Sequence, residues 1–438
     1  MQNACEPFVG KKITIMGLGL LGRGVGDAEF FAKCGAQVLV TDIKDASALQ
    51  GSVEALAKYS TITFHLGGHR TEDFTSADMV VKAAGVPLDS PYIEAARKAG
   101  VEVVMSTALF AKYAAEAGAT IVGITGTRGK STTTQMIYHS LIRANRRAVL
   151  GGNIRGVSTL ALLPEIQKGD ICVLELDSWQ LQGFGDLKIS PHIAVFTNLM
   201  SDHLNYYGGD MEKYFADKAN IFRFQKPDDV LVAGASVADR IRAAHPPLDP
   251  NVPEIIPRDW KLKIPGEHNR ENASLAVAAL QILGLSETET KNGLESFEGV
   301  EGRLQLVGEF NRVKIYNDNN ATTPDATIAA LRALAENVIL IAGGADKNLD
   351  LKELIAEMKK VCKSVVFLTG TGTERIRKEF PDAPVFDSLQ GAIHEAMQSA
   401  SIGDTILFSP AFASFGMFKN EYDRNDQFVA LIKDRTGA

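Results

Sequence analysis

The chain has few cysteines, and no two of them lie close together in the sequence. Cys5, Cys34, Cys172 and Cys362 are its four cysteines, and they form no CxxC pair. This spacing argues against a disulfide scaffold and against a cysteine-based zinc module. Because Cys34 and Cys172 lie in apolar runs, we expect them to be buried small hydrophobic side chains in a reduced cytoplasmic protein.

Features of secreted, membrane and nucleic-acid-binding proteins are also lacking. The first residues, MQNACEPFVGKK, contain no basic stretch followed by an apolar run, so we expect no signal peptide. No window approaches 18 uncharged apolar residues, and we therefore expect no membrane insertion. The net charge of −7 argues against a nucleic-acid partner.

What the sequence does contain is an alternation of strand-like apolar runs and helical stretches over most of its 438 residues. This alternation predicts an α/β fold with mainly parallel sheets. The pattern starts at residues 12–17, again at 120–126 and again at 303–318, where a hairpin is expected. We therefore expect three domains, over 1–115, 116–300 and 301–438.

The sharpest motif is GITGTRGKS at residues 123–131, between a β-rich run and a helical stretch. Its glycines allow backbone N–H groups to turn toward phosphate oxygens, and the helix N-terminus adds a positive dipole. We expect Lys130 to reach the β- and γ-phosphates and Ser131 to offer its hydroxyl to Mg²⁺. Five residues, where the strict pattern has four, separate Gly123 from Gly129, so the loop is a variant. The alternative is an ordinary strand-to-helix turn.

A second glycine-rich motif, GLGLLG at residues 17–22, also lies between a strand and a helix. Asp42 ends the next predicted strand, 20 residues after Gly22, where a ribose-binding acid is found in dinucleotide-binding folds. We expect a nucleotide here. The alternative is a tight turn without a ligand.

Other polar residues allow both a structural and a functional interpretation. Glu175 and His203 follow strand-like runs, where a nearby triphosphate would favour Mg²⁺ roles, although each alone is more often a satisfied polar group. Lys218 lies in a helical pattern, where a lysine is ordinarily solvated. Asn269 and Asn272 open a predicted helix, where asparagine also acts as a cap.

Together these motifs resemble the Mur ligase family, and the resemblance covers essentially the whole chain. The segments that carry it are GLGLLGRG (17–24), GITGTRGKSTTT (123–134), GGNI (151–154), LELDSWQL (174–181), SDHLNYY (201–207), YFADKANIF (214–222), GEHNRENA (266–273), EGRLQ (301–305), NDNNATTPDAT (317–327), GGADKNLD (343–350) and FSPAFASFGMFKNEYDRN (408–425). The N-terminal unit separates the chain from folylpolyglutamate synthases, which resemble only the later parts.

The resemblance implies a Rossmann-like UDP-binding domain (1–115), a P-loop ATPase-type ATP-binding domain (116–300) and a Rossmann-like amino-acid-binding domain (301–438). It is strongest to the branch that adds D-glutamate to UDP-N-acetylmuramoyl-L-alanine in peptidoglycan synthesis. In that branch ATP phosphorylates the substrate carboxylate, and the amine of the amino acid attacks the acyl phosphate. ATP and two Mg²⁺ are the implied cofactors, and we expect a monomer.

The family's functional residues match individual positions of this chain. The UDP substrate is expected at Gly19, Leu20, Leu21, Asp42, Lys44, Asn153, Ser178 and Gln180. ATP is expected at Gly126, Thr127, Gly129, Lys130, Ser131, Thr132, Asn269, Asn272, Arg303 and Asp318. The amino acid is expected at Asn320, Thr322, Lys347, Ser414 and Tyr422. The catalytic residues are expected to be Lys130, Glu175, His203 and Lys218, and the metal ligands Ser131, Glu175, His203 and a carbamylated Lys218.

Five positions depart from the family pattern. Arg128 stands where asparagine is commoner, and Asp177 replaces a small hydroxyl residue. Gly302 stands where many relatives carry histidine, and Glu421 replaces an aromatic residue. Asn320 replaces a lysine that helps to bind the D-glutamate carboxylate, which removes a contact of about 1.5–3 kcal/mol.

Three alternatives follow from these residues. The alternative closest to the D-glutamate ligase is an enzyme with the same chemistry that adds L-glutamate or another amino acid, because Asn320 replaces the expected lysine. An NAD-linked oxidoreductase built on the N-terminal unit leaves residues 123–131 unexplained. A non-catalytic nucleotide-binding protein leaves Lys130, Glu175, His203 and Lys218 unexplained.

Overall fold

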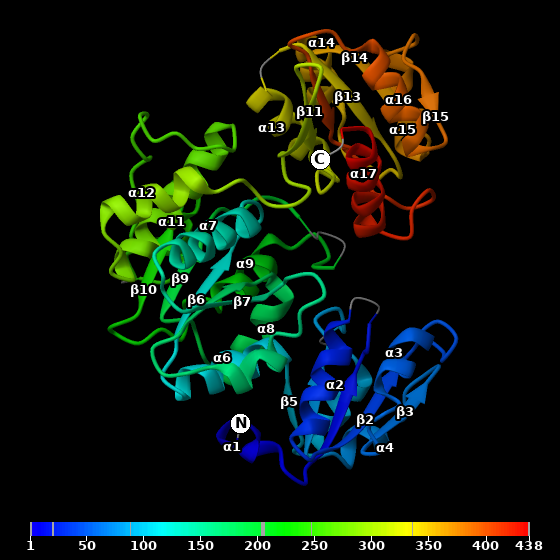
Figure 1. Ribbon diagram of the computed structural model, residues 1–438. Coiled ribbons are helices and arrows are strands. Elements are labelled where there is room, and N and C mark those ends of the chain that lie inside the picture. The colour runs from blue at the N-terminus through cyan, green and yellow to red at the C-terminus, as the bar shows by residue number, and fades with distance from the viewer. Residues whose placement is uncertain are drawn as a thin grey trace. The chain divides into compact units, whose positions relative to one another are not determined.

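The computed structural model describes residues 2–19, 22–87, 89–202, 206–246, 248–334 and 336–436. The chain divides into two compact units, one made of Met1–Glu254 with Ser274–Gly293 and the other of Ile255–Ala273 with Leu294–Ala438. Two five-stranded sheets lie in the first unit and a six-stranded sheet lies in the second, each flanked by helices (Figure 1). The α/β class and the three domains are confirmed, and the boundaries near 115 and 300 stay predictions.

The N-terminal sheet is parallel and has the strand order β3-β2-β1-β4-β5. Its strands are β1 (Lys12–Met16), β2 (Gln37–Asp42), β3 (Ile62–Leu66), β4 (Met79–Lys82) and β5 (Glu102–Val104). The connecting helices are α2 (Arg23–Lys33), α3 (Gln50–Leu56), α4 (Glu72–Thr75) and α5 (Pro91–Lys98), preceded by α1 (Gln2–Cys5) and η1 (Glu6–Phe8). The order reverses between β1 and β4, and such a reversal is where open sheets bind ligands.

The central sheet is also parallel, with the order β10-β9-β6-β8-β7. Its strands are β6 (Thr120–Thr125), β7 (Ala148–Gly152), β8 (Ile171–Glu175), β9 (Ile193–Phe196) and β10 (Val230–Ala233). Helices α6 (Ser106–Glu116), α7 (Lys130–Arg143), α8 (Ser178–Leu187), α9 (Met211–Ala219), α10 (Ala235–Ala244), α11 (Glu267–Ile282) and α12 (Glu287–Ser296) follow, with η2 (Leu160–Glu165). Every residue of β8 and β9 is buried, as continuous apolar runs in a parallel sheet require.

The C-terminal sheet has the order β11-β12-β16-β13-β14-β15. Its strands are β11 (Gln305–Phe310), β12 (Val313–Asn317), β13 (Val338–Gly343), β14 (Cys362–Leu368), β15 (Val385–Phe386) and β16 (Thr405–Phe408). Between and after them lie α13 (Pro324–Leu334), α14 (Lys352–Val361), α15 (Thr371–Ile376), η3 (Arg377–Glu379), α16 (Leu389–Ser399) and α17 (Glu421–Thr436). Strands β11 and β12 are antiparallel, which confirms the predicted hairpin.

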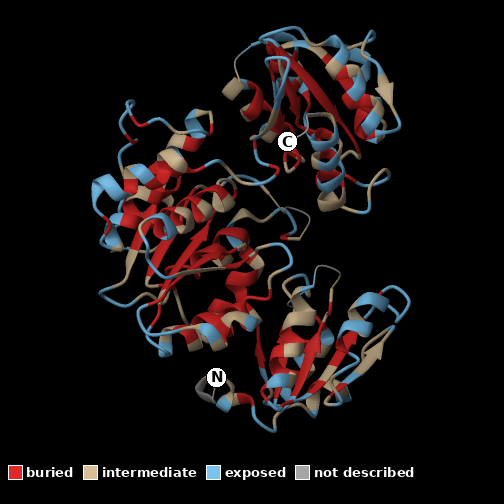
Figure 2. Ribbon diagram, viewed as in Figure 1, coloured by how far each residue is buried: buried red, intermediate tan, exposed pale blue. Residues whose placement is uncertain are grey.

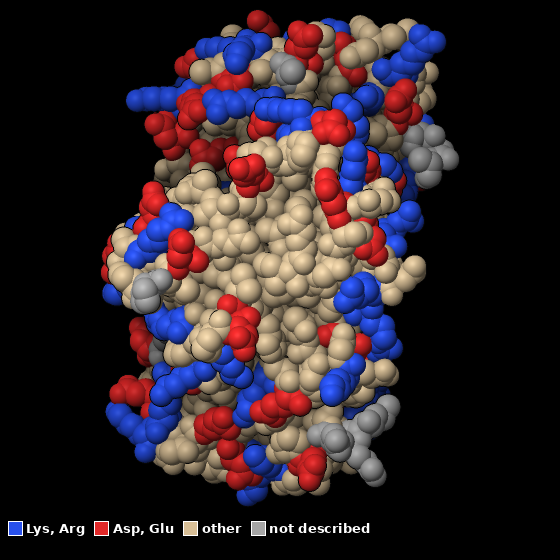
Figure 3. All heavy atoms as spheres, turned by 90° about the vertical axis from the view of Figure 1, so that its left-hand side faces the viewer, with Lys and Arg blue, Asp and Glu red and all other residues tan. Residues whose placement is uncertain are grey.

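Burial follows the layers of each domain. In Figure 2 most residues of the central strands are buried, strands such as β3, β11 and β15 carry intermediate or exposed residues, and further exposed residues lie on the outer sides of the helices. Among the described residues on the face drawn in Figure 3, basic and acidic side chains are interspersed around an area that carries none. In the described part of the chain, no helix combines the length and the apolar character needed to span a bilayer.

The cysteines correct one expectation. Cys5 and Cys34 form a disulfide with a Cα–Cα distance of 4.7 Å, so Cys34 is buried but is not a free thiol. The spacing of 29 residues concealed this pair because the segment before β1 returns to the C-terminal end of α2. Cys172 is a buried free thiol, as expected, and burial raises its pKa to about 12.

Candidate active site

The loop between β6 and α7 has the backbone that phosphate binding requires. Gly126 has φ +145°, and a Cβ at this position would overlap Oγ1 of Thr197, so the loop accepts only glycine there. Gly129 adopts a left-handed conformation, φ +79°, and turns the chain into α7 at Lys130. The first N–H groups of a helix have no partner within it, and they point out of this loop toward any bound anion.

The segment after β9 holds the loop in place. Oγ1 of Thr127 accepts a hydrogen bond from the N–H of Met200 at 2.9 Å, and the N–H of Arg128 donates to Oδ1 of Asn198 at 2.9 Å. The guanidinium of Arg128 lies 4.0 Å from the carboxylate of Asp202. The added cation in this variant loop therefore has an acidic neighbour on the adjacent segment.

Two lysine side chains converge on one carbonyl oxygen of the loop. Lys130 Nζ donates to the carbonyls of Gly126 and Thr127, both at 3.1 Å. Lys218, on α9, is 1% exposed, and its Nζ donates to the same Gly126 carbonyl at 2.8 Å and to Oγ1 of Thr125 at 3.3 Å. Burial, together with the nearby charge of Lys130, holds the pKa of Lys218 well below its ordinary value. The interpretation of Lys218 as a solvated helix lysine is wrong.

Glu175 lies beside this loop because the strands are in register. It ends β8 opposite Ile124 of β6 and Gly152 of β7, and it is 4% exposed. Its carbonyl accepts a hydrogen bond from the N–H of Asn153 at 2.7 Å. A Cβ at Gly152 would overlap that carbonyl, so the glycine allows the two strand ends to approach.

Helix α8 begins with a complete capping box. The side chain of Asp177 accepts from the N–H of Gln180 at 2.7 Å, and Oε1 of Gln180 accepts from the N–H of Asp177 at 3.1 Å. Nε2 of Gln180 donates to Oγ1 of Thr107 at 3.2 Å. Aspartate caps a helix as well as serine or threonine, which accounts for the departure at Asp177.

Asp42 orders the glycine-rich loop of the N-terminal domain. Its Oδ2 accepts hydrogen bonds from the N–H groups of Leu18 at 2.9 Å and Gly19 at 3.4 Å, and its Oδ1 accepts from the N–H of Lys44 at 2.9 Å. The carboxylate is buried. Asp42 therefore has a structural role in the loop in addition to any contact with a nucleotide.

A polar cluster at the C-terminal ends of β12 and β16 lies in the second unit. Asp318 is buried and accepts from the N–H of Leu304 at 3.0 Å and from the hydroxyl of Ser409 at 2.8 Å. Burial raises the pKa of Asp318 to about 7. Lys347 Nζ donates to Oγ1 of Thr322 at 3.0 Å, so two of the residues expected at the amino acid lie together.

Two departures from the family pattern are neighbours in this domain. Gly302 has φ +68°, and a Cβ there would lie 3.1 Å from Nδ2 of Asn320 and 3.1 Å from Oδ1 of Asn425. Nδ2 of Asn320 donates to the carbonyl of Glu301 at 3.3 Å. The left-handed backbone and the close neighbours favour glycine over a side chain at residue 302.

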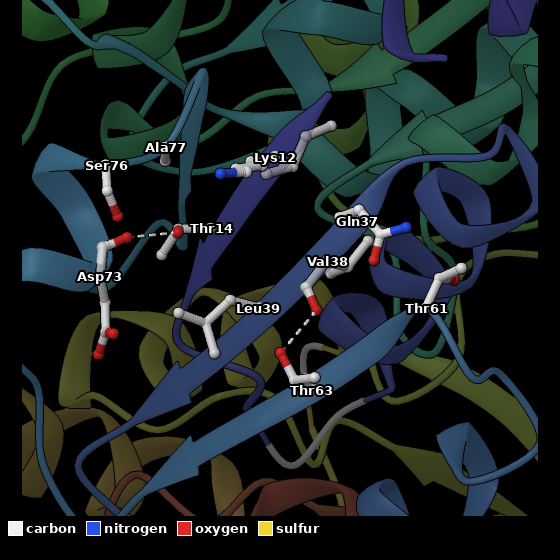
Figure 4. A pocket seen from close by; sticks show the side chains of 11 residues that line it. Lys12, Thr14, Gln37, Val38, Leu39, Thr61, Thr63, Asp73, Ser76 and Ala77 are labelled. Atoms are coloured by element: carbon white, nitrogen blue, oxygen red, sulfur yellow. Dashed lines mark hydrogen bonds between the residues drawn. The ribbon is translucent and has the colours of Figure 1, made fainter. Parts of the chain in front are cut away.

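Two of the cavities that described residues form lie in the first unit. One of about 770 Å³ is lined by Pro87, Gln182, Tyr206, Asp217 and neighbouring residues of α9, the helix that carries Lys218. Another of about 280 Å³ lies over β1, β2 and β3, where Thr14 donates to the carbonyl of Asp73 (Figure 4). None of the predicted site residues that the structure describes lines this second cavity.

Three domain families match the chain in order. They are the Mur ligase MurD-like N-terminal domain at residues 11–105, the Mur ligase middle domain at 124–246 and the Mur ligase glutamate ligase domain at 302–412. The UDP-N-acetylmuramoylalanine–D-glutamate ligase of Roseiflexus sp. (strain RS-1) is 36% identical over 98% of this chain and 100% of its own length. The chain belongs to the Mur ligase family. The enzyme of the same name from Clostridioides difficile (strain 630) is 32% identical over 96% of this Mur ligase and 97% of its own length.

Solved structures agree on the fold of this Mur ligase. The UDP-N-acetylmuramate-alanine ligase MurC of Thermotoga maritima aligns with a TM-score of 0.60 and 20% identity over 97% of this chain and 100% of its own. The MurF ligase of the same organism, in complex with ADP, has a TM-score of 0.60 and 15% identity over 99% and 96% of the two chains. FolC of E. coli, in complex with ADP, has a TM-score of 0.55 and 18% identity over 76% and 94%.

The predicted site residues of this Mur ligase fall into three groups. The first unit contains Gly19, Asp42, Lys44, Gly126, Thr127, Gly129, Lys130, Ser131, Thr132, Asn153, Glu175, Ser178, Gln180 and Lys218. The second contains Asn269, Asn272, Arg303, Asp318, Asn320, Thr322, Lys347, Ser414 and Tyr422. Leu20, Leu21 and His203 lie outside the described residues. Their binding roles stay predictions.

Sequence reasoning missed two arginines beside these residues. Arg23, which begins α2, donates to the side chain of Asn153. Arg424 is 0% exposed and donates to Oδ1 of Asn319 at 2.8 Å and to its carbonyl at 2.9 Å, and burial lowers the pKa of Arg424 to about 10. Both lie inside segments that carry the family resemblance, which was the available signal.

Proposed function

We propose that this Mur ligase joins D-glutamate to UDP-N-acetylmuramoyl-L-alanine and converts ATP to ADP and phosphate. The substrate carboxylate takes the γ-phosphoryl group, and the amine of D-glutamate then displaces phosphate from the acyl phosphate. The observation that carries the proposal is the convergence of Lys130 and Lys218 on the Gly126 carbonyl, in a chain that aligns from end to end with D-glutamate ligases. We propose that it acts in the cytoplasm, as a monomer, in peptidoglycan precursor synthesis.

The first step brings a carboxylate anion toward a triphosphate anion, and positive charge must offset their repulsion. The N–H groups of the loop and of the first turn of α7, which begins at Lys130, would donate to phosphate oxygens of a bound nucleotide. Lys130 Nζ lies 3.1 Å from two loop carbonyls, within reach of an anion in the same loop. Lys130 is therefore the proposed partner of the β- and γ-phosphates.

ATP chemistry implies Mg²⁺, and the residues beside the loop fit this ion. Ser131 lies in the first turn of α7, and Glu175 ends the neighbouring strand. A hydroxyl and a carboxylate, completed by triphosphate oxygens, are ligands that Mg²⁺ prefers, and the bound ion would neutralise phosphate charge. Among the described residues, no three or more His, Cys, Asp and Glu side chains are grouped so that they could hold a metal ion, so the proposed site depends on the triphosphate oxygens. His203, outside the described residues, is the proposed ligand of a second ion.

The surroundings of Lys218 support the proposal that this lysine is carbamylated. Its ammonium shares the Gly126 carbonyl with Lys130, so two cations repel, and burial favours the neutral amine. The lone pair of the neutral Nζ attacks the carbon of CO₂, an N–C bond forms and the amine releases a proton to solvent. The product is an anion, which Lys130 would attract and which could coordinate or orient Mg²⁺.

Chemical rescue tests the carbamate. Lys218→Ala should lose turnover, and added formate or acetate should restore part of it by replacing the missing carboxylate-like group. Lys98→Ala, at a side chain that is 73% exposed on α5, is the control and should retain wild-type turnover. Wild-type turnover in Lys218→Ala, or the lack of a carbamate ¹³C signal in enzyme equilibrated with ¹³CO₂, would contradict the carbamate.

Asn320 affects one part of the proposal, which is the identity of the amino acid that supplies the amine. Lys347, beside Thr322, is the proposed partner of a glutamate carboxylate, and Ser414 and Tyr422 complete the proposed pocket. The test is release of phosphate from ATP and UDP-N-acetylmuramoyl-L-alanine with D-glutamate, L-glutamate or other amino acids. Preference for D-glutamate supports the proposal. Equal rates with both enantiomers, or a preference for another amine, would contradict the D-glutamate assignment and leave the ligase chemistry in place.

A further inference from the structure

Arg23 connects the glycine-rich loop of the N-terminal domain to the loop after β7. It is the first residue of α2, and its Nη2 donates to Oδ1 of Asn153 at 2.9 Å. Its Nε donates to the carbonyl of Ile154 at 3.1 Å. The planar fork of a guanidinium holds two acceptors in one geometry, which a lysine ammonium does not do. The two bonds therefore fix both the course of the loop and the direction of the Asn153 amide.

A second contact, one helical turn farther along α2, holds the same loop. Asp27 is buried and accepts a hydrogen bond from the hydroxyl of Ser158 at 2.6 Å. A Cβ at Gly26 would lie 2.5 Å from Cβ of Ser158, so the helix and the loop approach closely because residue 26 has no side chain. Arg23 and Asp27 are four residues apart and lie on one face of α2.

The side-chain amide of Asn153 keeps its Nδ2 group available as a hydrogen-bond donor. Its backbone N–H donates to the carbonyl of Glu175 at 2.7 Å, and its Oδ1 accepts from Arg23. Within the described part of the chain, no residue accepts a hydrogen bond from its Nδ2. A side-chain amide whose oxygen is engaged offers only N–H donors. Asn153 is therefore prepared to bind an acceptor oxygen beside the strand end that carries Glu175.

We propose that Arg23 is a positioning residue, which turns the Asn153 amide so that Nδ2 donates to an acceptor oxygen of the UDP-muramoyl substrate. The inference rests on the proposed function, which supplies a substrate rich in phosphate, sugar and carbonyl oxygens. Arg23 directly follows the glycine-rich loop, and the N–H of Asn153 donates to the carbonyl of Glu175. The Arg23–Asn153 hydrogen bond therefore connects the proposed substrate-binding loop to the C-terminal end of β8.

A double-mutant cycle tests the link. Arg23→Met should raise KM for UDP-N-acetylmuramoyl-L-alanine about tenfold, as expected for a lost hydrogen bond to a charged group, with kcat and KM for ATP nearly unchanged. In an Asn153→Ala background, Arg23→Met should raise this KM further by less than about twofold, because the partner of Arg23 is already absent. Arg97→Met is the matched control: it removes the Arg97–Asp186 ion pair (3.1 Å), also between the N-terminal and central domains, and should leave KM unchanged.

Several results would overturn the inference. Additive effects of Arg23→Met and Asn153→Ala, an equal rise in KM for ATP, or wild-type KM in Asn153→Asp would each do so. Thermal unfolding checks that the variants fold, and Arg23→Lys, expected to have an intermediate KM, replaces Arg23→Met if that variant does not fold. If the wild type proves inactive with D-glutamate, the proposed function fails. Calorimetric binding of UDP-N-acetylmuramoyl-L-alanine without ATP then decides, and equal affinities of wild type and Arg23→Met refute the role of Arg23.

Discussion

Asp318 should make the stability of the C-terminal domain fall as the pH rises. Its buried carboxyl accepts two hydrogen bonds, yet burial raises its pKa from 3.8 to about 7. A group whose pKa is higher in the folded state favours folding fully below its unfolded pKa, and this contribution is lost as the pH rises through the folded pKa. At about 1.4 kcal/mol per pH unit, the free energy of unfolding falls by about 4 kcal/mol over this range.

Asp318→Asn removes the titrating group and keeps a side chain that can accept from Leu304 and bond to Ser409. We expect the stability of the variant relative to wild type to increase between about pH 4 and pH 7 and then to stay constant. Denaturant unfolding at several pH values measures the difference. The fluorescence of Trp260, which is 5% exposed, follows unfolding of the second unit. For this purpose Trp179, the tryptophan of the first unit, is replaced by phenylalanine in both wild type and Asp318→Asn.

Parallel curves for Asp318→Asn and wild type would refute the reasoning, because the carboxyl would then titrate alike in the folded and unfolded states. Asp27→Asn provides the control in the first unit. Burial raises the pKa of Asp27 to about 6. The difference in the free energy of unfolding between Asp27→Asn and wild type should therefore stop growing about one pH unit earlier than for Asp318→Asn. Trp179 fluorescence in a Trp260→Phe background follows that unit.

Three further substitutions test the two ligand sites. Lys130→Ala should abolish phosphate release while the far-UV circular dichroism stays unchanged, because the proposed role of this lysine is to neutralise phosphate charge. Wild-type rates would contradict the mechanism. Gly126→Ala should abolish ATP binding in calorimetry, since its Cβ would overlap Thr197 and its φ is +145°; retained affinity would show that the loop is not the ATP site. Asn320→Lys should lower KM for D-glutamate about tenfold by restoring a charge-assisted hydrogen bond, and an unchanged KM would place the amino acid elsewhere.

Local pattern was sufficient for the elements that carry the binding loops. The runs KITIM, TIVGIT and ICVLE are strands β1, β6 and β8, because buried parallel strands need nearly continuous apolar residues. The runs of β10 and β15 are short and give a weaker signal, and glycines weaken the signal of β7. Strand β3, ITFHL, mixes polar and apolar residues and is only partly buried.

Side-chain surroundings were less predictable than elements. Helical periodicity alone predicts a solvated Lys218, whereas α9 places this side chain, 1% exposed, against the loop between β6 and α7. The resemblance to Mur ligases marked Lys218, but it did not indicate that Lys130 shares its carbonyl partner. The distant Cys5 and Cys34 likewise gave no pairing signal until α1 and α2 were placed.

The sequence by itself determined the α/β class, the two glycine-rich loops and membership of the Mur ligase family. These depend on the local spacing of glycine, apolar and charged residues, which a linear chain displays directly. Only the tertiary structure decided which polar atoms meet. Arg23 and Asn153 are 130 residues apart and lie 2.9 Å from each other because α2 packs beside the loop after β7. Hydrogen bonds act over about 3 Å, so their partners follow from strand order and helix packing rather than from distance along the chain.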